Sequence, residues 1–96
     1  MARKTGTQIL SYRVVVEKEA YQDGSQVYVT QVPSLGISDY GGTIEEALAH
    51  TERLIKFHIE SLVEEGEAVP VPDDIRNIIV TTSQVQISSA KKLAFA

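Results

Sequence analysis

Apolar and polar residues alternate with a period of two along the N-terminal half of the chain. One face of an extended backbone over residues 9–17 would present Tyr12, Val14 and Val16. β-branched and aromatic residues in this pattern predict a strand. Residues 27–32 have the same character and end before Pro33, which has no amide hydrogen to donate to a strand ladder. Asp23-Gly24 supplies the positive-φ residue of a hairpin turn between them, and residues 35–40 predict a third, short strand.

The hydrophobic period changes to three and four residues after Gly41-Gly42, which we interpret as a turn. The new apolar stripe consists of Ile44, Leu48, Thr51, Ile55, His58 and Leu62. It predicts a helix that runs to about Glu65, with Gly66 as the expected C-terminal stop. Thr43-Ile44-Glu45-Glu46 fits a capping box, in which Glu46 reaches back to the Thr43 amide.

Residues 75–88 predict a fourth strand, because β-branched residues are frequent there. The order β-β-β-α-β is an α+β fold, with one long helix packed on a small, mainly antiparallel sheet. We expect a flexible N-terminal tail (1–8), one domain (9–88) and a C-terminal tail (89–96). The predicted core consists of Tyr12, Val14, Val16, Val27, Val29, Ile44, Leu48, Ile55, Leu62 and Ile87.

Negative charge is concentrated on the predicted helix. Residues 43–67 contain seven acidic and two basic residues, a net charge of −5, whereas the whole chain has a net charge of −4. Most of these carboxylates lie on the polar side of the stripe, where solvation is their ordinary explanation. A localised negative surface would also attract a basic partner. We therefore predict a partner-binding face formed by Glu45, Glu52, Glu60 and Glu64.

The composition and the spacing of the remaining residues argue against several kinds of catalytic or binding site. The chain has no Cys, which excludes a disulfide, a thiolate metal site and a cysteine nucleophile. His50 and His58 lack the spacing of a helical zinc site, no Ser lies in a G-x-S-x-G elbow, and no glycine pattern predicts a phosphate loop. We expect no catalytic residue, metal or cofactor. The acidic balance also argues against a protein that binds nucleic acid through bulk charge.

No targeting or membrane segment is evident. No apolar run approaches the ~20 residues of a membrane helix, and the basic N-terminus is not followed by the apolar stretch of a secretory signal. The expectation is a soluble protein of the cytoplasm.

Four segments resemble a known family when they are taken in order. They are the strand 12–19, the strand and proline-led loop 27–36, the helix entry Gly42-Thr43-Ile44-Glu45-Glu46-Ala47-Leu48, and the helix end 58–67 with its Pro70-x-Pro72 exit. Together they resemble the HicB-like antitoxin family, the small partners of HicA toxins in bacterial toxin–antitoxin systems. The loop 33–38 departs from the family, because it lacks the Cys of the usual Pro-Gly-Cys-like pattern.

The resemblance implies a partial ribonuclease-H-like fold without the catalytic carboxylates. It also implies dimers or tetramers, and an inhibitor that covers the active surface of a small, basic, RNA-cleaving toxin. Only about 24 residues follow Pro72, too few for a helix-turn-helix, so we expect no direct DNA binding.

Three hypotheses follow. The first is a non-enzymatic, antitoxin-like binding module that acts as a homo-oligomer. The second is an orphan structural or regulatory oligomer with the same fold. The third is a degenerate nuclease-like enzyme that uses helix carboxylates, Glu46 among them, to hold a divalent metal.

Overall fold

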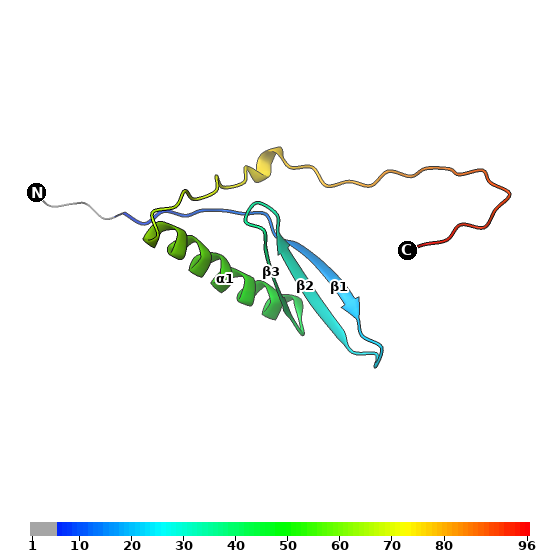
Figure 1. Ribbon diagram of the computed structural model, residues 1–96, viewed down its shortest axis with the longest axis horizontal. Coiled ribbons are helices and arrows are strands. Elements are labelled where there is room, and N and C mark those ends of the chain that lie inside the picture. The colour runs from blue at the N-terminus through cyan, green and yellow to red at the C-terminus, as the bar shows by residue number, and fades with distance from the viewer. Residues whose placement is uncertain (1–5) are drawn as a thin grey trace, which may run out of the picture.

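The structure, a computed structural model, describes residues 6–96 and consists of a three-stranded antiparallel sheet with one long helix (Figure 1). Strands β1 (Val15–Ala20), β2 (Gln26–Val32) and β3 (Ile37–Gly41) lie in the order β1-β2-β3. Helix α1 (Ile44–Glu64) packs on the β2 and β3 side of this sheet. The predicted α+β arrangement is confirmed, in the order β-β-β-α.

The β1–β2 hairpin closes as the Asp-Gly dipeptide predicts. The Tyr21 amide donates to the Ser25 carbonyl (2.8 Å), and the Gly24 amide donates to the Tyr21 carbonyl (3.0 Å). Gly24 has a φ of +89°, a conformation that residues with a side chain rarely adopt. The turn therefore fixes the register in which Glu19 faces Val27 and Glu17 faces Val29.

Both ends of α1 are closed by the residues that the sequence indicates. At the N-terminus, the Thr43 hydroxyl accepts from the Glu46 amide (3.0 Å). At the C-terminus, the Gly66 amide donates to Val63 and the Glu67 amide donates to Leu62, with Gly66 at a φ of +73°. These two bonds form a Schellman motif, which satisfies carbonyls that the end of a helix leaves free.

The contact between the sheet and α1 contains a polar pair at its centre. The Thr30 and Thr51 hydroxyls are hydrogen-bonded to each other, and both side chains are buried. Thr51 also donates to the Ala47 carbonyl one turn earlier (2.7 Å). Burial of these hydroxyls is tolerated because each has partners.

Gly41 brings the start of the helix against the sheet. A Cβ built on Gly41 would lie 2.5 Å from the Ala47 amide nitrogen. Only glycine permits this approach, so Gly41 is a packing position as well as the end of a strand.

The first strand is shorter than predicted. We expected it to begin at residue 9, whereas β1 begins at Val15. Its partner β2 ends at Val32 before Pro33, so residues before Val15 extend beyond the ladder. They keep an extended backbone and lie beside the chain that follows α1 (Figure 1).

The fourth strand predicted over residues 75–88 is not formed. A short 3₁₀ turn, η1 (Ile75–Asn77), occupies its start, and residues 78–96 contain no strand. The Asp74 side chain accepts from the Arg76 amide and caps this turn. After η1 the chain runs away from the sheet, as Figure 1 shows, so it meets no strand partner among residues 6–96.

The core is smaller than predicted. Val27, Val32 and Ala47 are the buried apolar residues of the described chain. Of the predicted core, Ile44, Leu48 and Ile87 are exposed, and the remaining members other than Val27 are partly buried. The missing fourth strand explains this difference, because three strands cover only part of the apolar stripe of α1. Residues 1–5 of the predicted N-terminal tail lie outside the described residues.

Candidate functional site

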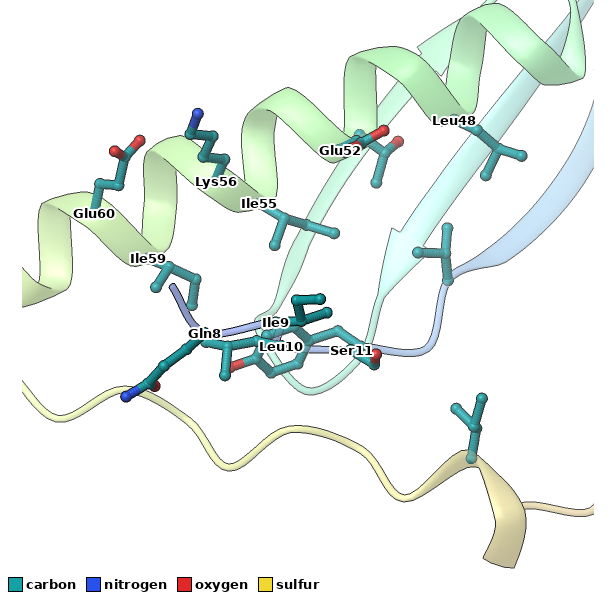
Figure 2. A pocket seen from close by; sticks show the side chains of 14 residues that line it. Gln8, Ile9, Leu10, Ser11, Leu48, Glu52, Ile55, Lys56, Ile59 and Glu60 are labelled. Carbon is teal, nitrogen blue, oxygen red and sulfur yellow. The ribbon is translucent and has the colours of Figure 1, made fainter. Parts of the chain in front are cut away.

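An apolar groove of about 710 Å³ lies between α1 and the segment that precedes β1. The helix contributes Leu48, Ile55 and Ile59. In Figure 2, Ile55 and Ile59 lie on the side of Ile9 and Leu10, and Leu48 lies at the other end of the groove. Ile75 of η1 also lines this space. An open groove with aliphatic walls suits the apolar side chains of another chain, because their contact removes hydrocarbon surface from water.

The groove exists because two segments far apart in sequence are joined. The Asp73 amide donates to the Ser11 carbonyl (2.9 Å), and the Tyr12 hydroxyl donates to the Pro70 carbonyl (2.6 Å). These bonds hold the N-terminal wall of the groove against the chain that leaves α1. The stiff, proline-containing connection thus positions the wall.

The Asp73 carboxylate is the centre of this junction. It accepts from the Ser34 hydroxyl (2.6 Å) and from the Arg13 amide (2.7 Å). The Ser34 bond, followed by the Arg13 amide bond, lowers the pKa of the Asp73 carboxyl. Burial raises the pKa of the neighbouring Tyr12 hydroxyl, and the negative charge of Asp73 adds to this effect. One ionised carboxylate therefore joins three segments of the chain.

The four glutamates predicted to meet a partner are all exposed on α1. Glu52 and Glu60 line the groove together with Lys56, whereas Glu45 and Glu64 do not. In Figure 2, Lys56 and Glu60 point away from the aliphatic floor. Within residues 6–96 the only ion pair joins Arg76 to Asp74 (3.0 Å), so these glutamates have no ion-pair partner there. The structure thus places two of the four predicted residues at the rim of an apolar groove.

A second, shallower hollow lies on the other flank of α1. It has a volume of about 390 Å³ and is lined by Asp39, His50, Arg53, Leu54 and Phe57. The His50 Nδ1 lies 2.7 Å from the Tyr40 carbonyl, which can only accept, so this nitrogen donates. The bond holds the imidazole against the sheet.

The part of the chain that the structure describes contains no cluster of side chains that would bind a catalytic metal ion. No group of three or more His, Asp or Glu side chains is arranged there to hold a metal ion. Glu46 lies in the first turn of α1 and is exposed, and its amide donates to the Thr43 cap. Among the described residues, the groove is lined mainly by aliphatic side chains, and Glu52, Lys56 and Glu60 are its charged lining residues.

Sequence reasoning missed the groove, and two of the four glutamates that it named, Glu52 and Glu60, line it. Ile9 and Leu10 were assigned to a strand, which gave them no separate role. The signal that could have revealed them is that they are consecutive apolar residues. In a strand with one covered face, one of the two would point into solvent, so a second contact surface would be needed. Ile9 has an exposed fraction of 90%, an unusual position for an isoleucine without a contact partner.

Comparison of the sequence with known proteins matches most of the chain to one protein family. A family model described as the HicB_like antitoxin of bacterial toxin-antitoxin system matches residues 12–87. A UPF0150 protein of Synechocystis sp. is 40% identical over 70 residues, which cover 72% of this chain and 84% of that protein.

A relative from a virus shares the same region. An uncharacterised 14.9 kDa protein of Haemophilus phage HP1, from the rep-hol intergenic region, is 35% identical over 68 residues. The match covers 71% of this chain but only 48% of the phage protein. No solved structure matches the chain significantly, so the partial ribonuclease-H-like fold stays a prediction. Among the described residues, no helix has the length and apolar character needed to cross a membrane.

Proposed function

This chain belongs to the HicB-like antitoxin family, and on that premise we propose that it neutralises a small, basic, mRNA-cleaving toxin of the HicA type by covering its active surface. In this proposal the protein is a binding module and not an enzyme. It acts in the cytoplasm without cofactor and without direct contact to DNA, and it works as a homo-oligomer.

The observation that carries the proposal is the combination of an aliphatic groove with an acidic rim on α1. Glu52 and Glu60 line the groove, and Glu45 and Glu64 extend the negative surface along the same helix. A basic partner would be attracted by the rim and held by apolar contact in the groove. Charges at the edge of an interface mainly raise the association rate, and buried apolar anchors mainly slow dissociation.

Self-association is supported by the small core. Only three apolar residues of the described chain are buried, whereas several large apolar side chains on and beside α1 are exposed. A chain of this size buries a modest share of its surface alone, and oligomerisation is a common remedy.

Charge reversal on the rim tests the proposed interface. Combined, the substitutions Glu45→Lys, Glu52→Lys, Glu60→Lys and Glu64→Lys should weaken binding of the proposed basic toxin by at least about tenfold at 0.15 M salt. Each reversal removes an attraction and adds a repulsion. Isothermal titration calorimetry at several salt concentrations measures the effect, which should shrink as salt screens the charges.

A matched pair of variants controls for net charge. Glu52→Lys/Glu60→Lys and Glu17→Lys/Glu19→Lys change the charge equally, but the second pair lies on β1. The first pair should lose more affinity than the second, and both should keep the circular dichroism of α1. Equal losses in both pairs would refute a specific role for the rim. Absence of any neighbouring basic protein would leave the orphan oligomer as the better description.

A further inference from the structure

The C-terminal arm, residues 78–88, is rich in β-branched residues and has no partner among the described residues. It contains no charged residue, and Ile79 and Val80 have exposed fractions of 87% and 86%. Val85 and Ile87 alternate with Gln84 and Gln86, the pattern of a strand with one apolar face. The sequence of the arm thus favours a strand that this molecule alone does not form.

Both outer strands of the sheet, β1 and β3, have β2 as their single neighbour among the described residues. The β1 edge is the one that lies beside the chain leading to the arm. Hydrogen-bonded pairs alternate along an antiparallel ladder, and Tyr21 bonds Ser25 at the hairpin. The backbone groups of Val16, Lys18 and Ala20 therefore point outward, and they form a free edge that another strand can extend.

The chain after α1 already lies beside the segment that leads into β1. Its connector runs beside residues 11–13, with the Asp73 amide bonded to the Ser11 carbonyl. The 3₁₀ turn η1 then ends this alignment, because the Asp74 side chain caps it and the Asn77 amide donates to the Asp74 carbonyl (3.0 Å). Figure 1 shows the arm leaving the sheet at this point. The turn thus separates the arm from the β1 edge of its own molecule.

Charge favours pairing between copies. Residues 75–96 contain three basic and no acidic residues, whereas residues 1–74 contain thirteen acidic and six basic residues. β1 itself presents Glu17 and Glu19. The arm itself is uncharged, but Lys91 and Lys92, which begin three residues after it, would be attracted to the acidic body of the other copy.

We propose that two copies exchange their C-terminal arms, each arm adding a strand to the free edge of β1 in the other copy. This inference rests on the proposed self-association, and it is independent of toxin binding. Because each copy gives one arm and receives one arm, the exchange forms a closed, twofold symmetric dimer. The β1 edge of each copy is then paired.

Proline substitution in the arm tests whether the arm holds the dimer together, and the mass of the assembly is the readout. Light scattering after gel filtration should give twice the 10.5 kDa chain mass for the wild type. Val80→Pro/Val85→Pro should give the mass of one chain, because proline removes two ladder donors. Ala94→Pro lies outside the arm and should remain a dimer. Circular dichroism should show an unchanged helix in all three proteins.

Cross-linking between differently tagged chains tests the contact itself. The protein has no Cys, so Lys18→Cys in one chain and Gln84→Cys in another can be joined by a short bismaleimide. A cross-linked heterodimer is expected. Ser38→Cys on β3, at the opposite edge of the sheet, should give no heterodimer with Gln84→Cys.

Three results would overturn the exchange. A wild-type monomer would refute both the exchange and self-association. A dimer that survives both prolines and gives no Lys18–Gln84 cross-link would refute the exchange while self-association stands. A cross-link formed mainly within one doubly substituted chain would show that the arm folds back on its own edge.

Discussion

A single carboxylate, Asp73, shapes the candidate site. It receives hydrogen bonds from Ser34 and from the Arg13 amide, and its own amide bonds Ser11. Arg13 and Ser34 lie in segments that carry the family resemblance, but nothing in those segments indicates a bond to Asp73. The sequence alone identified neither this junction nor the groove wall that it holds, because the bonds of Asp73 to Ser11 and Arg13 join positions 62 and 60 residues apart.

Replacement of Asp73 by Asn should destabilise the fold in a pH-dependent way. The native pKa of Asp73 is lowered, so its ionised form contributes stability above the unfolded pKa of about 3.9. That contribution is lost as the pH falls through the lower native pKa. Asp73→Asn should therefore unfold at a lower urea concentration than the wild type at pH 7, and the difference should close below about pH 4.

Asp74→Asn is the matched control for this experiment. The Asp74 carboxyl also has a lowered pKa, chiefly through its hydrogen bond with Arg76, but its partners lie within residues 74–77. Its loss should change the urea midpoint less than the loss of Asp73. Equal effects, or a gap that persists in acid, would contradict the proposed junction.

At the scale of elements, local signals predicted structure well and pairing signals did not. Thr43 and Gly66 mark the ends of α1 through bonds to neighbours three to five residues away, so the sequence specified its bounds. The arm over 78–88 has strand composition, but composition does not name a partner strand. The same difficulty affected residues 9–14, which are extended but lie beyond the end of β2.

Gly41 provides a sharp test of how α1 sits on the sheet. In Gly41→Ala, the new methyl would meet backbone atoms of Glu46 and Ala47 at 2.5–2.9 Å. The helix start would have to move, at a cost of about 1–3 kcal/mol. Urea denaturation should record this loss.

Gly42→Ala is the control for the same element. Its new methyl would meet only the Glu46 carboxylate, at 3.8 Å, and Gly42 has no positive φ. This variant should be neutral or slightly more stable, by about 0.4–1 kcal/mol. A Gly41→Ala protein as stable as Gly42→Ala would contradict the close approach of α1 to β3.

At the scale of the whole molecule, the chain is far more extended than a compact domain. Its radius of gyration is 19.1 Å, whereas a compact chain of this length has about 12 Å. The extension comes from the segment after η1 (Figure 1). The small core, the open groove and the free arm leave apolar surface exposed to water, and binding of partners would cover it.

The central claim is that the groove side of α1 is where a basic partner docks. Nuclear magnetic resonance titration of the ¹⁵N-labelled protein with a small, basic toxin of the HicA type tests this claim most directly. The largest amide shifts should occur at Leu10, Glu52, Lys56 and Glu60, and they should weaken as salt rises. Shifts confined to Glu17 and Glu19 of β1, or to the flank around His50 and Phe57, would contradict the account.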